Sequence, residues 1–184
     1  KRKLAAGAGL LGLLWSYSPL TLATPAATVS LVVDEAPAPP VQHGLGKLKL
    51  ALRQRGVVVE EAASLEKATA GTVVVAGLSS GAGAGARLIT ELQLTPPKDA
   101  ESLLIRKLNR GGKALVLVTG SDARGLMYAL LDVADRVGWA KSAGQPFSEV
   151  RDTEEKPYAP ERALSLYTFN RAYWESRFYD EAYW

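Results

Sequence analysis

A serine between two glycines is the most direct candidate for chemistry in this sequence. Gly77-Leu78-Ser79-Ser80-Gly81 matches G-x-S-x-G after an apolar run, where a nucleophile elbow holds its serine on a strained strand-to-helix turn. Such hydrolases place the histidine after the serine, whereas the only histidine, His43, precedes Ser79. We therefore interpret the motif as a glycine-rich surface loop and assign His43 no role.

Two further glycine patterns are typical of phosphate binding. Residues 81–86 (GAGAGA) satisfy G-x-G-x-x-A, but no clear strand–helix–strand unit encloses them, which favours a flexible loop over a nucleotide-dependent oxidoreductase. Residues 120–125 (GSDARG) lack the Lys-Ser/Thr pair that would hold phosphate and magnesium. There, Ser121 or Asp122 is predicted to cap a helix, and Gly125 to let its first turn approach a strand. We expect no cofactor and no metal.

Four pairs of carboxylates are neighbours in the sequence. On a strand, adjacent side chains point to opposite faces, so such a pair does not flank one glycosidic bond. We predict solvated charge for all four pairs: Asp34-Glu35, Glu60-Glu61, Glu154-Glu155 and Asp180-Glu181. The chain has no cysteine, which excludes a thiolate nucleophile, a disulfide framework and a zinc–thiolate site within it.

Periodicity predicts the elements that would position these residues. Strands are expected at 28–33, 57–60, 72–76, 101–108 and 113–119, the last two forming an antiparallel hairpin around Asn109-Arg110-Gly111-Gly112. Helical spacing begins at Val41 and closes at Gly56, and a second helix follows Asp122. This order, which allows a short helix between the strands at 72–76 and 101–108, predicts an α+β fold, with a mixed, mostly antiparallel sheet and two helices on one face. A doubly wound parallel sheet fits less well.

The first 26 residues have the order of a signal peptide. Three basic residues precede an apolar run from Leu4 to Trp15, and small residues follow. The run is shorter than the ~20 residues of a transmembrane helix, so we expect export to the periplasm or outside the cell, without a stable membrane span after cleavage. Removing the leader's three basic residues from the total of 22 leaves 19, equal to the 19 acidic residues. A neutral mature chain gives no electrostatic argument for nucleic acid.

The rest of the chain falls into three segments of different composition. Residues 27–150 are enough for one small α+β domain. Residues 151–161 are charged and proline-bearing, are not expected to pack as an element, and are interpreted as a linker. Residues 162–184 begin with a strand-like run and then become rich in aromatic residues, which predicts the start of a second, truncated domain.

Residues 113–130 and the later Arg162-Ala-Leu-Ser-Leu carry a resemblance to known proteins. The stretch TGSDARGLMYAL, with the strand before it, resembles the small N-terminal domain of β-N-acetylhexosaminidases (glycoside hydrolase family 20) and α-glucuronidases. The resemblance covers about residues 28–184. It implies a non-catalytic accessory domain followed by the first strand of a (β/α)8 catalytic barrel, whose carboxylates lie later in the chain.

The same resemblance suggests substrate-binding residues. Arg162 looks like the arginine that opens the first barrel strand and binds sugar hydroxyls, and Asn170 could contribute an amide. Family 20 enzymes tend to have an aspartate and a closing arginine on that strand, where this chain has Tyr167 and Asn170. That departure implies a divergent relative.

Two functions from different classes follow from the sequence. The first is the N-terminal, non-catalytic portion of a secreted glycoside hydrolase, with a carbohydrate substrate and the missing barrel as its partners. The alternative is a stand-alone exported carbohydrate-binding or interaction module without catalysis.

Overall fold

The described residues contain one mixed sheet of six strands, in the order β2-β1-β3-β5-β4-β6. They are residues 27–159, 161–163 and 174–183 of the computed structural model, so the predicted leader and most of the predicted barrel strand lie outside them. The elements run in chain order as β1 (Thr28–Val33), α1 (Pro39–Gln54), β2 (Val58–Ala62), β3 (Thr72–Leu78), α2 (Ala84–Glu91), β4 (Leu103–Arg110), β5 (Lys113–Gly120), α3 (Ala123–Trp139) and β6 (Thr153–Glu155).

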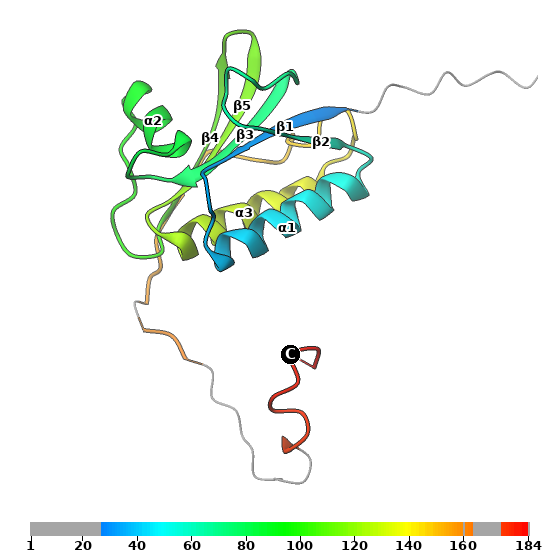
Figure 1. Ribbon diagram of the computed structural model, residues 1–184, viewed down its shortest axis with the longest axis vertical. Helices are drawn as coiled ribbons and strands as arrows, with labels where there is room; N and C mark the ends of the chain where they lie inside the picture. Colours follow the sequence, from blue (N-terminus) through cyan, green and yellow to red (C-terminus); the bar gives the residue numbers. More distant parts are fainter. Residues whose placement is uncertain (1–26, 160, 164–173, 184) are drawn as a thin grey trace, which may run out of the picture.

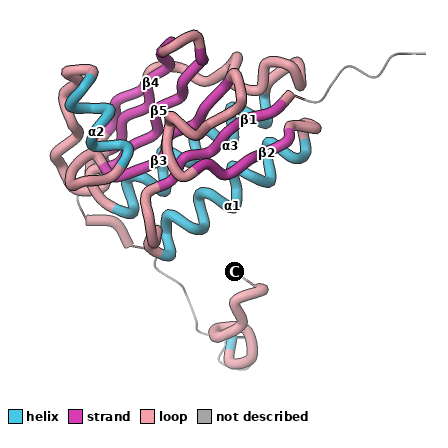
Figure 2. The backbone as a smooth tube through the Cα atoms, turned by 45° about the horizontal axis from the view of Figure 1, so that its top comes forward, coloured by secondary structure: helices cyan, strands magenta, loops and turns pink. Residues whose placement is uncertain are grey.

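The sheet is covered on both faces, by unequal helix layers (Figures 1 and 2). Because strand side chains alternate between faces, Val74 and Ala76 of β3 join the core under α1 and α3, whereas Val73 and Val75 join the core under α2. The prediction of two helices on one face is confirmed for α1 and α3. The short helix α2 lies on the opposite face. Its first residues, 84–86, belong to the stretch predicted to be a flexible loop, and that part of the prediction is wrong.

The α+β class is confirmed, but the expectation of a mostly antiparallel sheet is wrong. β2, β1, β3 and β5 are mutually parallel, and antiparallel pairing is confined to β5 with β4 and β4 with β6. The crossover through α1 makes β2 parallel to β1. β3 then pairs on the other side of β1. Its continuous apolar run, Val73–Ala76, is buried on both faces, as in strands of parallel sheets.

Part of the stretch predicted as a linker belongs to the sheet. Thr153–Glu155 forms β6 and pairs with β4, and the guanidinium of Arg106 donates to the Thr153 carbonyl at 3.1 Å. The carboxylate of Asp152 also accepts from the Lys107 amide at 2.8 Å. The expectation that this stretch forms no element is therefore wrong for these residues, because their polar groups satisfy the outer edge of β4.

Two local predictions are confirmed. The β4–β5 turn holds Gly111 and Gly112 at φ of 57° and 77°, the positive values that a tight hairpin turn requires. Asp122 caps α3, since its side chain accepts from the amides of Arg124 at 3.0 Å and Gly125 at 2.9 Å. In the part of the chain that the structure describes, no helix is long and apolar enough to cross a membrane.

Two glycines of α1 provide a matched test of the α1–α3 packing. A Cβ on Gly44 would lie 2.9 Å from Cβ of Leu130 on α3, whereas one on Gly46 would meet nothing within 4 Å. Gly46→Ala should therefore raise the free energy of unfolding by about 0.5–1 kcal/mol through helix propensity. Gly44→Ala should lower it by about 1–3 kcal/mol through overpacking. Urea unfolding of both variants measures the two changes in the free energy of unfolding, which should have opposite signs. Equal stabilisation by both substitutions would contradict the close contact between α1 and α3 at Gly44.

Candidate functional site

Of the two residues predicted to bind sugar, the structure describes only Arg162, which lies at the end of the small domain. Arg162 is exposed, and its guanidinium pairs with the Glu101 carboxylate and lies 6.0 Å from the centre of the Tyr128 ring. Glu101 also pairs with Arg124 at 3.2 Å. Asn170 lies outside the described residues. The sugar-binding role of both residues stays a prediction.

We call Asp99, Glu101, Arg124, Tyr128, Lys156 and Arg162 the junction cluster. Lys156 pairs with Asp99 at 2.9 Å, so two cations that follow β6 bind acidic residues of the loop before β4. This pairing raises the pKa of Lys156 above its usual value, through the hydrogen bond and charge of Asp99. Glu101 has a φ of 58°, a left-handed conformation that costs a non-glycine residue energy. The cluster ties the segment after β6 to the small domain.

The serine motif does not form a nucleophile site in the structure. Ser79 is buried, and its hydroxyl donates to the carbonyl of Pro97 at 3.2 Å. His43 lies exposed on α1, so the hydroxyl is engaged by a backbone carbonyl rather than by an imidazole. Ser79 therefore serves the local fold, in agreement with the assignment of no triad.

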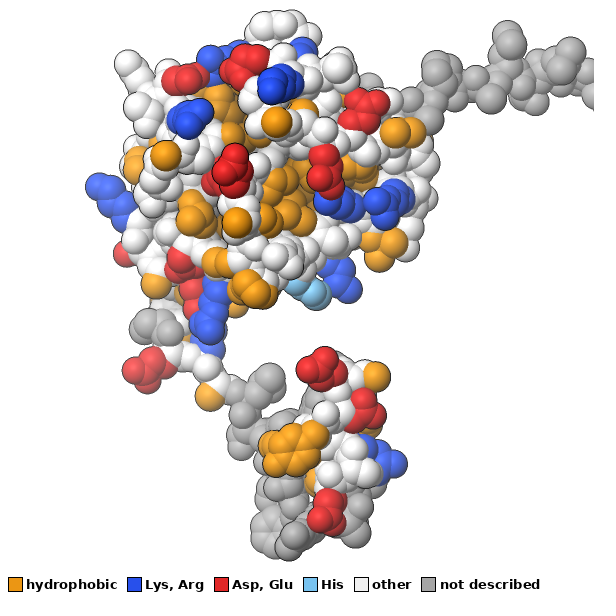
Figure 3. All heavy atoms as spheres, viewed as in Figure 1, with side chains coloured by type: hydrophobic (Ala, Val, Ile, Leu, Met, Phe, Trp, Pro, Cys, Tyr) orange, Lys and Arg blue, Asp and Glu red, His pale blue; other side chains and the backbone are white. Residues whose placement is uncertain are grey.

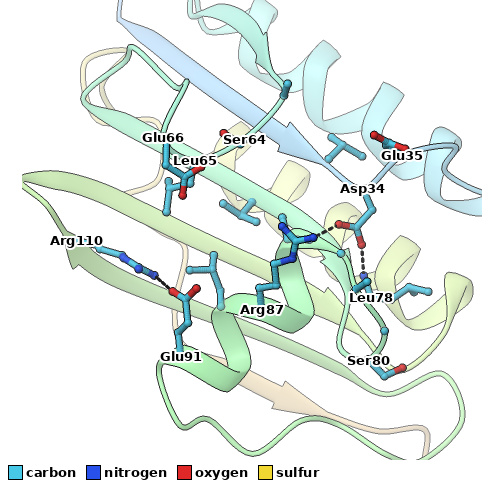
Figure 4. A pocket seen from close by; sticks show the side chains of 18 residues that line it. Asp34, Glu35, Ser64, Leu65, Glu66, Leu78, Ser80, Arg87, Glu91 and Arg110 are labelled. Atoms are coloured by element: carbon cyan, nitrogen blue, oxygen red, sulfur yellow. Dashed lines mark hydrogen bonds and ion pairs between the residues drawn. The ribbon is translucent and has the colours of Figure 1, made fainter.

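A crevice of about 610 Å³ lies across the sheet face that carries α2. It begins where β1 and β3 end, and it runs between α2 and the loop that follows β2 (Figure 4). The chain leaves β1 for α1 on one face and leaves β3 for α2 on the other, so this end is a topological switch point. Open sheets with parallel strands commonly bind ligands at such a point. We call this space the α2 crevice.

Asp34 organises the closed end of the α2 crevice. Its two carboxylate oxygens accept from the Leu78 amide at 3.0 Å and the Ala84 amide at 2.7 Å, which joins the ends of β1 and β3 to the start of α2. A Cβ on Gly83 would approach this carboxylate to 2.2 Å, so glycine is required there. The prediction of solvated charge at Asp34 is wrong. A carboxylate after a buried strand, together with glycines after a neighbouring strand, was the signal available in the sequence.

The rim of the α2 crevice carries charges of both signs. Hydrogen bonds from Ser64 and from its own amide, assisted by the charges of Arg110 and Arg87, hold the pKa of Glu66 below its usual value. Arg110 pairs with Glu91 at the far end (Figure 4), whereas Arg87 forms no ion pair within the described ranges. Glu66 therefore remains an anion under mildly acidic conditions.

This arrangement suits binding rather than acid–base catalysis. Both oxygens of Asp34 are occupied by amides, so this carboxylate is not an available base. Among the described residues, no group of three or more histidines, cysteines or carboxylates could hold a metal ion. What the α2 crevice offers is an apolar floor with hydrogen-bonding groups at its rim.

Comparisons with known proteins show a likeness of fold. No protein-family profile matches the chain, and no curated protein matches it. A solved structure described as a "GH138 enzyme targeting pectin rhamnogalacturonan II" is similar, with a TM-score of 0.52 and 18% sequence identity. The likeness covers 85% of this chain and 21% of that chain. At this identity it shows a shared fold, and this chain spans about a fifth of the enzyme.

The role of Asp34 can be tested by substitution. Asp34→Ala removes both acceptors and should lower the free energy of unfolding by about 1–3 kcal/mol, because two amides lose a charged partner. Amide hydrogen exchange at Leu78 and Ala84 should accelerate. Glu35→Ala, at the exposed neighbouring carboxylate, should change stability by no more than about 0.5 kcal/mol. Unchanged exchange at both amides in the Asp34 variant would contradict the assigned role.

Proposed function

We propose that this chain is the non-catalytic N-terminal portion of an exported glycoside hydrolase, with its catalytic barrel beyond residue 184. The observation that carries the proposal is the likeness of most of the chain to a small part of a glycoside hydrolase. The motif TGSDARGLMYAL, which resembles the accessory domain of β-N-acetylhexosaminidases and α-glucuronidases, supports the same assignment. On this proposal, a carbohydrate is the substrate of the whole protein.

The roles of the described carboxylates support a non-catalytic assignment. Glycoside hydrolysis requires two carboxyl groups flanking one bond, one of them available as an acid. Here Asp34 accepts two amides, Asp122 caps α3, and Glu101 holds two arginines. The acid and its partner are therefore proposed to lie in the barrel.

The junction cluster supports continuation into a second domain. It fixes Lys156 and Arg162 on the end of the small domain where α3 begins, and Arg162 is the first residue of the predicted barrel strand. Arg162 and Asn170 are proposed to contact sugar hydroxyls from that strand. Glu101 and Tyr128 then limit where the guanidinium of Arg162 can lie, which couples the small domain to the barrel entrance.

The proposal predicts a division of activity between this chain and a longer protein. The 184-residue chain should fold and show no turnover of chromogenic hexosaminides or uronides, whereas the full reading frame should hydrolyse one of them. In the full protein, Arg162→Ala should lower kcat/KM by about 10–150-fold, the effect of losing hydrogen bonds worth about 1.5–3 kcal/mol. Arg53→Ala, at an exposed arginine of α1, is the control.

Two outcomes would overturn this assignment. A stop codon shortly after Trp184 would favour the stand-alone exported module. Turnover by the 184-residue chain that Arg162→Ala abolishes would show that the catalytic groups lie within it.

A further inference from the structure

We propose that the α2 crevice binds a segment of a neutral oligosaccharide, which gives the small domain a carbohydrate site of its own. The choice of a saccharide rests on the proposed function. The location and the charge class of the ligand rest on the crevice itself. Its volume of about 610 Å³ falls within the ~300–1,000 Å³ range of small-molecule sites.

The shape of the α2 crevice favours an elongated ligand. Asp34 and Leu78 lie at one end of it, and Glu91 and Arg110 lie at the other, with α2 forming one wall (Figure 4). The opposite wall is the loop that carries Ser64, Leu65 and Glu66. A single small group would contact one end only, whereas a short run of sugar units could contact both.

The net charge of the lining disfavours phosphate-bearing ligands. Four carboxylates against two guanidinium groups give the lining a formal charge of −2, which repels anions. A phosphate at the start of α2 would also need the backbone amide that Asp34 already occupies. Glu91 is paired with Arg110, and Asp34 accepts from two amides, so neither carboxylate is available to a compact cation. An uncharged ligand is therefore the best match.

The polar groups of the rim match hydroxyls. Carboxylates accept from sugar hydroxyls and guanidinium groups donate to them, and Glu66 and Arg87 place both kinds of group at one opening. Arg87 is exposed and forms no ion pair with any described residue, so its donors are available. The exposed Ser80 adds a hydroxyl from the loop before α2.

The floor supplies the apolar contact that the less polar face of a sugar ring requires. It includes Val75 from β3 and Leu88 from α2. Figure 3 shows apolar side chains at the surface between acidic and basic ones on one face of the small domain, a pattern consistent with such a site. Aliphatic contacts combined with precisely placed polar groups are the usual composition of ligand sites.

The test measures binding to the whole 184-residue chain by saturation-transfer NMR and calorimetry. The probes are neutral hexasaccharides of cellulose, xylan, mannan and chitin, with hexagalacturonate as the anionic counterpart. We expect saturable binding of at least one neutral probe, with weaker binding of hexagalacturonate. Arg87→Ala should weaken that binding at least tenfold, and Ser80→Trp should abolish it by filling the opening. Arg53→Ala, which removes an exposed arginine from the opposite helix layer, should leave it unchanged.

Several results would overturn the inference. These are no binding of any neutral probe, tighter binding of hexagalacturonate, or neutral binding that Arg87→Ala and Ser80→Trp leave intact. Circular dichroism of the two variants checks that a loss of binding does not come from unfolding. If the full protein hydrolyses glycosides while the crevice binds no probe, this inference fails and the proposed function stands. If the α2 crevice binds a neutral probe but no barrel follows in the full reading frame, this inference stands and the proposed function fails.

Discussion

The carboxylate of Asp34 is the contact on which this architecture depends most directly. It joins the end of β1 to the end of β3 and to the first residue of α2, which lie 44 and 50 residues later in the sequence. Because the chain continues from β1 to α1 and from β3 to α2 on opposite faces of the sheet, its two paths diverge beyond the strand ends, and the carboxylate joins them there. Gly77 and Gly83 leave room for it. The same contact closes one end of the α2 crevice and occupies the amide that a phosphate would otherwise use.

A second set of ionic contacts fixes the segment in which the chain leaves the small domain. β6 satisfies the outer edge of β4, and the junction cluster then holds Lys156 and Arg162 beside the start of α3. Exposed ion pairs contribute only about 0–1 kcal/mol each, so their role is better understood as orientation than as stability. Glu101 departs from this pattern, since its carboxylate is mostly buried and its backbone is held at a positive φ. The pairing of Arg162 with Glu101 would therefore set the direction in which a following domain leaves the small domain.

Structural features that depend on neighbouring residues could be predicted from the sequence, whereas features that depend on contacts between distant residues could not. β1, the β4–β5 hairpin and the Asp122 cap follow from local rules, and each was predicted. The parallel register of β3 was missed because strand order is decided by core packing and by the α1 crossover. β6 was missed because its charged residues are stabilised by Arg106, 47 residues away from Thr153. Asp34 was assigned to solvent because its partners lie 44 and 50 residues later.

We propose that the small domain binds carbohydrate through the α2 crevice, while its other helix layer serves packing. Amide chemical-shift mapping of the 184-residue chain, titrated with the neutral hexasaccharides, tests this most directly because it reports the location of binding. We expect saturable shifts in the loop that carries Ser64 and Glu66, in residues 80–84 and at Arg87, with α1 and α3 unchanged. Shifts confined to α1 and α3, or no shifts with any of these hexasaccharides, would contradict the claim.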